Sequence, residues 1–325
     1  MAQNYFNPKE VLLAKIRTRG GWVNAHSHID RAYILTEENF QLSNSSLQQK
    51  WALPDEFKAK ANVDDIYSNM ARAVETMCEQ GVQALGSFID VDPVIKDKAI
   101  LAAQKVRDNF KNDIQIKFIN QVVKGVIDPE ARKWFEVGAE FVDIIGGLPE
   151  KDEGHEAEHL DILFDTAKKS GKMMHVHIDQ YGLPEQRDTE LLVQKTIEHN
   201  YQGKVVAVHG ISIAAQPKDY RKKLYKQMHD AGLLVITCPL AYIASHRSEV
   251  LAPIHNSIAP VEEMLEADLT VGLGGDNIHD IYMPFADGDM WSEMRVLLEA
   301  CYIRDLDALA DIATINGLKA LGLSH

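Results

Sequence analysis

Short apolar runs alternate with longer stretches of helical periodicity along the whole chain. Eight of these runs are rich in Val, Ile, Leu and Phe, and each predicts a buried strand because it is short and bounded by polar or glycine residues. They fall at 22–25, 82–90, 114–121, 141–146, 172–179, 204–209, 233–237 and 270–274. Residues 64–80 and 95–110 repeat apolar side chains every three or four positions, as the buried face of a helix does.

The residues between these segments agree with that pattern. Glycine can take the left-handed conformation that ends a helix, and four glycines stand where a helical pattern gives way to a strand: Gly81, Gly171, Gly203 and Gly232. Asn62 and Thr189 are predicted helix N-caps. Further helices are expected at 8–18 and 306–321.

A strand followed by a helix, repeated eight times, predicts an α/β fold that is a single (β/α)8 TIM barrel. A doubly wound open sheet is the structural alternative. Residues 31–61 form a long, mostly polar connection after the first strand, and such segments commonly act as lids or binding loops. We therefore expect one domain, residues 1–325, with 31–61 as its lid or binding loop.

Composition narrows the range of partners. With 46% apolar and 25% charged residues the chain is typical of globular proteins. Its 34 basic and 48 acidic residues give a net charge of −14, which disfavours binding to nucleic acid or to an anionic membrane surface. The three cysteines form no CxxC pair, and no apolar run reaches the roughly 20 residues that span a bilayer. A cytoplasmic location is expected.

Polar residues typical of metal sites follow several of the predicted strands. His26 and His28 are two apart and point to the same side of a strand. His177, His209 and Asp276 lie at the ends of three others, and barrel chemistry is found at this face. A lone histidine such as His209 is more often only a hydrogen-bonded polar residue, and Asp276 alone could be a helix N-cap. Their joint occurrence favours a divalent metal site, with zinc the favoured ion and iron or manganese as alternatives.

Five strand-end segments stand out: His26-Ser27-His28-Ile29-Asp30-Arg31, Asn120-Gln121, His177-Ile178-Asp179-Gln180, Val208-His209-Gly210, and Gly275-Asp276-Asn277-Ile278-His279-Asp280 running into Tyr282-Met283-Pro284-Phe285. Together they resemble the amidohydrolase superfamily, in particular its cytosine deaminase-like branch, which includes hydrolases of amino-triazines such as N-isopropylammelide.

The resemblance implies a role for each of these residues. The ligands of one metal ion would be His26, His28, His177 and Asp276. His209 would hold and polarise the attacking water or a substrate carbonyl, and Gln121 would hydrogen-bond the substrate. Asn277, in the loop after the eighth strand, would also contact substrate. For His279, in the same loop, contact with substrate and a surface position are equal alternatives.

Two departures from the family pattern limit what carries over. Family deaminases have a glutamate three residues after the histidine of the fifth strand, where this chain has Gln180. An amide does not transfer a proton at ordinary pH, so acid–base work would fall to Asp276, helped by Asp179. Many members also flank the barrel with a small β-sandwich. We expect none here, whether by nature of the branch or by truncation, and the surface left uncovered favours a homo-oligomer.

The leading hypothesis is therefore a metal-dependent hydrolase of a C–N bond in a small nitrogen heterocycle, such as a pyrimidine, pterin or triazine, by deamination or amide hydrolysis. One alternative keeps the metal and changes the substrate to an ester, lactone or phosphoester. The other is a protein that binds a heterocycle without turnover, because Gln180 replaces the expected acid. His246 follows the seventh strand and could also reach this face.

Overall fold

The computed structural model describes residues 6–245, 247 and 258–324. Its eight parallel strands are β1 (Trp22–Asn24), β2 (Val82–Asp90), β3 (Gln115–Gln121), β4 (Ile145–Gly147), β5 (Met174–Ile178), β6 (Val205–His209), β7 (Leu234–Thr237) and β8 (Thr270–Leu273). They pair in chain order as two sheets, β1-β2-β3 and β4 to β8.

Backbone hydrogen bonds across both seams join the two sheets into one barrel. Between β8 and β1, the Ala25 N–H donates to the Leu273 carbonyl at 2.9 Å, and between β3 and β4 the Ile144 N–H donates to Phe118 at 3.2 Å. Ser27 also pairs with Asp276 across the first seam. The predicted TIM barrel is confirmed. In the described part of the chain these eight are the only strands, so no β-sandwich flanks the barrel there.

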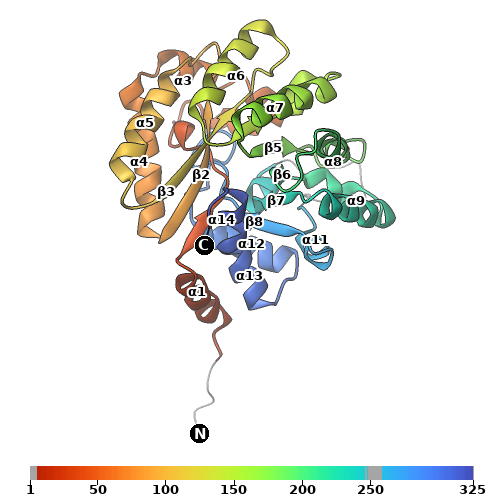
Figure 1. Ribbon diagram of the computed structural model, residues 1–325. Coiled ribbons are helices and arrows are strands. Elements are labelled where there is room, and N and C mark those ends of the chain that lie inside the picture. The colour runs from red at the N-terminus through yellow and green to blue at the C-terminus, as the bar shows by residue number, and fades with distance from the viewer. Residues whose placement is uncertain (1–5, 246, 248–257, 325) are drawn as a thin grey trace.

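Helices surround the strands (Figure 1). The α-helices are α1 (Pro8–Thr18), α2 (Leu47–Lys50), α3 (Asp55–Lys60), α4 (Val63–Glu79), α5 (Lys98–Phe110), α6 (Pro129–Phe141), α7 (Glu156–Ser170), α8 (Asp188–Glu198), α9 (Lys218–Asp230), α10 (Pro239–Ile243), α11 (Val261–Glu266), α12 (Met290–Ala300), α13 (Leu306–Ala313) and α14 (Ile315–Ala320). Short 3-10 helices are η1 (Ile29–Arg31), η2 (Phe40–Asn44), η3 (Pro149–Asp152) and η4 (Ile211–Ala215). No helix among the described residues is long and apolar enough to cross a bilayer.

Most predicted boundaries lie within two residues of the observed ones, but three differ. The fourth strand does not begin at 141, because Phe141 ends α6; a short apolar run fits either element. The helix predicted at 95–110 begins at Lys98, after Lys96 takes a φ of 58°. The helix predicted at 306–321 breaks at Thr314, whose φ of −136° is not helical.

The break at Thr314 turns α14 across the amino-terminal end of the barrel. Figure 1 shows this helix in front of the strands, near the middle of the molecule. A Cβ on Gly317 would lie 2.7 Å from a Val23 side-chain carbon, so the absence of a side chain lets α14 pack directly on the first strand. The helix closes one end of the barrel and leaves the other end for the site.

The caps were predicted with one error. The four helix-ending glycines all have positive φ, and Asn62 caps α4 in a reciprocal pair with Asp65, as predicted. Thr189 is not an N-cap, since it lies inside α8. Its hydroxyl instead donates to the Asp179 carboxylate at 2.5 Å. From the sequence alone, a threonine that caps a helix looks the same as one whose hydroxyl bonds a carboxylate ten positions earlier.

Residues 31–61 are packed rather than extended. They carry η2, α2 and α3, and Trp51 is only 8% exposed. The Tyr282 hydroxyl, from the loop after β8, donates to the Lys50 carbonyl at 2.9 Å. The segment therefore lies against the strand-eight loop, while its role as a lid stays a prediction.

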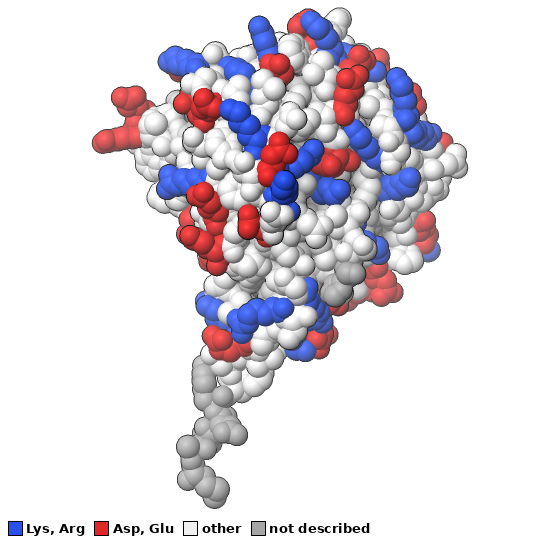
Figure 2. Space-filling model, turned by 60° about the vertical axis from the view of Figure 1, so that its left-hand side comes forward, with Lys and Arg blue, Asp and Glu red and all other residues white. Residues whose placement is uncertain are grey.

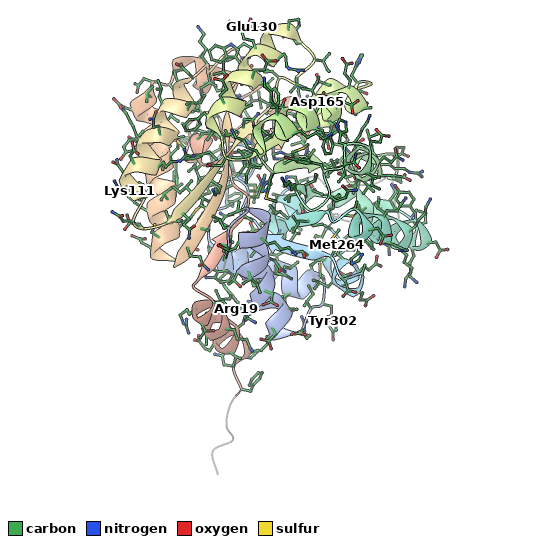
Figure 3. The ribbon with its side chains drawn as sticks, in the orientation of Figure 1. Arg19, Lys111, Glu130, Asp165, Met264 and Tyr302 are labelled. Carbon is green, nitrogen blue, oxygen red and sulfur yellow. The ribbon has the colours of Figure 1, made fainter. Side chains whose placement is uncertain are left out.

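Ion pairs on the surface join the first helix to the end of the chain. Arg19, labelled in Figure 3, lies beside α13 and contacts Asp307 at 3.2 Å and Asp311 at 3.1 Å. On the face drawn in Figure 2, basic and acidic side chains are interspersed. Neither sign forms a continuous field on that face, despite the acidic total.

Candidate active site

Four imidazoles and one carboxylate converge at the carboxyl end of the barrel. His26 and His28 follow β1, His177 and His209 lie in β5 and β6, and Asp276 follows β8. Asp276 Oδ1 lies 3.4 Å from His26 Nε2 and 3.3 Å from His28 Nε2. His28 Nε2 and His177 Nε2 are 3.4 Å apart. All five residues are buried, with at most 8% of their surface exposed.

The backbone around β8 makes room for this convergence. A Cβ on Gly274 would lie 2.7 Å from His26 Cβ and 2.9 Å from Cys238 Sγ, so this position requires glycine. Beyond it, the Asp276 carbonyl accepts from the His28 N–H at 3.1 Å. Asp276 and His209 both have positive φ, of 55° and 81°, which is strained for residues with a side chain and is typical of functional sites.

The imidazole nitrogens lack protein partners, which fits a bound cation. Both nitrogens of His26, and Nδ1 of His28 and of His209, are buried and have no hydrogen-bond partner among the described residues. Leaving buried polar atoms unpaired costs about 1–3 kcal/mol each. His177 Nδ1 lies 3.3 Å from the Gly147 carbonyl, which orients the ring and leaves Nε2 toward the cluster. Ligand atoms of His26, His28 and Asp276 lie within 4.8 Å of one another, as do those of His26, His177 and His209.

The electrostatics of the cluster also suit a metal. Burial lowers the pKa of His28 and of His177 well below the usual value, and lowers the pKa of His209 to about 3. Neutral imidazoles have a lone pair for a cation. Burial acts to raise the pKa of Asp276, but the close approach of His26 outweighs it, and the pKa lies below its usual value. This set of donors fits one divalent ion of the zinc, iron or manganese type.

A cavity of about 610 Å³ opens beside the cluster. Of the sequence-predicted site residues, the structure brings these to its wall: His28, Gln121, His177, Gln180, His209, Asp276 and Asn277. Residues 43–48, 50 and 51 also line it, which agrees with the binding role predicted for the 31–61 segment.

Gln180 contacts a buried acid that the sequence did not reveal. Gln180 Nε2 donates to Glu150 Oε2 at 3.2 Å, and Gln186 Nε2 donates to Glu150 Oε1 at 2.9 Å. Burial, with the charges of Asp188 and Asp179, raises the pKa of Glu150 to about 8. The Glu150 carboxyl group is therefore in direct contact with Gln180, the amide that occupies the position of the family glutamate.

Three predicted site residues do not line the cavity: His26, which is fully buried within the cluster, and Asp179 and His279. The Asp179 carboxylate accepts from the Asp188 N–H at 2.8 Å and from Thr189, so it anchors the start of α8 and does not line the cavity. His279 also lies outside the lining, with Nδ1 3.2 Å from the Pro284 carbonyl. Asp179 and His279 both follow strand ends, but the start of α8 holds the first and the loop after β8 holds the second. His246 lies outside the described residues.

Arg31, Lys50 and Tyr181 are among the cavity residues that were not predicted as site residues. Arg31 is the last residue of the His26–Arg31 motif, and that membership was the available signal. Lys50 lies in the 31–61 segment, which has no periodicity to place its side chains, and Tyr181 follows Gln180. Phe88 is the apolar support of the site: its ring centroid lies 4.4 Å from that of His177 and 5.1 Å from that of His26.

Comparison with known proteins agrees with this geometry. Residues 20–325 match the model of the amidohydrolase family. The chain belongs to the amidohydrolase family. The matched region includes all eight strands and all five residues of the cluster. The family predicted from the strand-end motifs is therefore confirmed, and the protein is a hydrolase.

Individual relatives are similar over most of the chain. An uncharacterized protein of Haemophilus influenzae is 51% identical over 261 residues, covering 79% of this chain and 95% of the relative. N-isopropylammelide isopropyl amidohydrolase of Pseudomonas sp. is 27% identical, covering 93% and 74%. The solved structure of 5-methylcytosine deaminase from Klebsiella pneumoniae, bound to 5-fluorocytosine, superposes with a TM-score of 0.85 at 22% identity, covering 93% and 74%, which supports the barrel fold.

Proposed function

We propose that this amidohydrolase hydrolyses a C–N bond in a small nitrogen heterocycle, a pyrimidine, pterin or triazine, with one divalent metal held by His26, His28, His177 and Asp276. The observation that carries the proposal is the buried imidazole–carboxylate cluster beside a cavity of about 610 Å³, a volume that suits a small ligand. The names of two relatives, an ammelide amidohydrolase and a methylcytosine deaminase, support a heterocycle as substrate.

Asp276 and His209 have different roles in the proposed reaction. A bound divalent metal supplies Lewis acidity, which makes water a competent nucleophile near neutral pH. The low pKa of Asp276 keeps its carboxylate ionised, so it can accept a proton from the attacking water and pass it to the leaving nitrogen. His209 is neutral, with a pKa of about 3, and therefore acts by hydrogen bonding to a carbonyl or to the water and not as an acid.

Three amides would orient the heterocycle. Gln121 Oε1 accepts from the Val122 N–H at 3.1 Å, which leaves its NH₂ group for a substrate carbonyl or ring nitrogen. Asn277 and Gln180 donate to Asp280 and Glu150, and their oxygens remain as acceptors. Fixed donors and acceptors of this kind select a ring with both an acceptor and N–H groups.

Metal analysis and a substrate panel test the proposal together. Purified protein is assayed for bound metal and for release of ammonia or amine from pyrimidines, pterins and amino-triazines. We expect activity with at least one heterocycle, and loss of both metal and activity in His26→Ala and Asp276→Ala. His155→Ala, at a side chain 61% exposed on the surface, is the matched control and should change neither. Retention of metal with hydrolysis of esters alone would refute the C–N proposal.

A further inference from the structure

A lysine of the 31–61 segment lies in the cavity wall without a counter-ion. Lys50 is the last residue of α2, is only 7% exposed and lines the cavity. Within the part of the chain that the structure describes, its ammonium makes no hydrogen bond and no ion pair. Burial lowers its pKa, with Asp280 acting in the opposite direction. The ammonium nitrogen is not among the fully buried unpaired atoms, so it keeps contact with the cavity and can bind a ligand there.

Asp280, the acid whose charge reaches Lys50, is already engaged. One of its carboxylate oxygens accepts from the backbone N–H groups of Tyr282 and Met283, at 2.8 and 3.0 Å. The other accepts from Asn277 Nδ2. Its charge reaches Lys50 only through space, which leaves the ammonium able to take a closer anion.

The backbone of Lys50 is fixed before any substrate arrives. Its N–H donates to the Ser46 carbonyl at 3.0 Å, and its own carbonyl accepts from the Tyr282 hydroxyl at 2.9 Å. Ser46 and Gln49 form a capping box that holds this single helical turn. Fixing this backbone in advance reduces the entropy that is lost when the ammonium binds a ligand.

Among the described residues, the cavity lining is more basic than the chain as a whole. It holds two basic residues, Arg31 and Lys50, and one carboxylate, Asp276, which faces the histidine cluster. Arg31 has acidic neighbours, with Asp90 at 3.5 Å and Asp280 at 3.8 Å. Lys50 is therefore the unneutralised cation of the lining, in a chain with a net charge of −14.

We propose that Lys50 binds an anionic oxygen of the substrate, either a carboxylate substituent or a ring oxyanion, so that the preferred heterocycle is acidic. This inference rests on the proposed function for the heterocycle and adds the charge that the cavity selects. A charge-assisted hydrogen bond from a partly buried ammonium is short and strong, and it would discriminate against the neutral analogue.

Two pairs of probes test it on zinc-loaded protein by calorimetric titration. Cytosine and cytosine-5-carboxylate differ in a carboxylate substituent, and 5,6-dihydrouracil and barbiturate differ in a ring oxyanion. We expect the anionic member of at least one pair to bind roughly 10- to 100-fold more tightly than the neutral one. Which pair shows the preference identifies the source of the anionic oxygen. Lys50→Met should abolish the preference and leave binding of the neutral members within about threefold, while Lys50→Arg should keep most of it.

The controls separate a substrate contact from a structural role. Lys60→Met, on the same segment but with a side chain 74% exposed, should keep the full preference. Four outcomes would overturn the role of Lys50. In the wild type these are equal binding within both pairs, or no binding of any probe. In Lys50→Met they are a preference that survives, or equal weakening of both members of a pair. Ammonia release is followed in the same samples. If ammonia is released but the anionic probes bind no more tightly than the neutral ones, only the role of Lys50 is refuted. If the anionic probes bind more tightly but no sample shows hydrolysis, only the proposed function is refuted.

Discussion

Replacing Glu150 with glutamine tests the buried acid behind Gln180. Glu150 is 9% exposed, and burial with the charges of Asp188 and Asp179 raises its pKa from 4.5 to about 8. The folded protein therefore keeps a proton that the unfolded chain releases near pH 4.5. Because the native state binds more protons in this window, the free energy of unfolding must fall as the pH rises from about 4.5 to about 8.

The size of this effect follows from the two pKa values. Linkage between pH 5 and pH 8.5 gives a loss of about 4 kcal/mol for the wild type, at 1.36 kcal/mol for each unit of separation. Glu150→Gln keeps a neutral side chain of the same shape, which can still accept from Gln186 and pair with Gln180. The variant should gain about 4 kcal/mol relative to the wild type between these pH values.

Urea unfolding at pH 5, 7 and 8.5 measures that difference, since all other titrating groups are common to both proteins. Glu140→Gln, at an exposed position of α6, is the control and should follow the wild type at every pH. Parallel stability curves for the wild type and Glu150→Gln would show that the buried carboxyl ionises normally, and would refute the reasoning.

Three further variants test the site and its support. Gly274→Ala places a Cβ 2.7 Å from that of His26 and should weaken zinc binding roughly 10- to 100-fold in a chelator competition, whereas Gly171→Ala, with open space around it, should not; equal affinities would contradict the packing argument. Gln180→Glu brings a second carboxyl beside Glu150, where one must stay protonated, and should raise deamination of cyclic amidines by about 10²-fold or more; an unchanged rate counts against the missing acid as the limit. Phe88→Ala removes a fully buried ring and should lower the free energy of unfolding by about 3–5 kcal/mol in urea titrations, and a loss below 1 kcal/mol would show that the ring does not support the histidines.

The strand-end cluster was predictable because a parallel barrel brings all strand ends to one rim. His26 and His28 follow β1, whose carboxyl end lies at that rim. The positions of His177, His209 and Asp276 at the cluster follow from the same rule, and the distances above confirm that they meet.

Loops without periodicity explain most of what the sequence did not reveal. Lys50 reaches the cavity through a segment of short helical turns, and Glu150 reaches Gln180 from η3, so neither position follows from a repeat. Asp179 was misplaced because the chain after β5 turns back and brings the start of α8 to its carboxylate. The break at Thr314 comes from packing on the barrel end, which overrides the continuous apolar pattern of 306–321.

The most direct test of the metal site is anomalous diffraction from crystals of the protein as purified, measured at the zinc, iron and manganese absorption edges. We expect one strong peak per chain, within about 2.3 Å of nitrogen atoms of His26, His28 and His177 and an oxygen of Asp276. A peak elsewhere, or none in protein that is active as a hydrolase, would contradict the central claim that these four residues hold the catalytic ion.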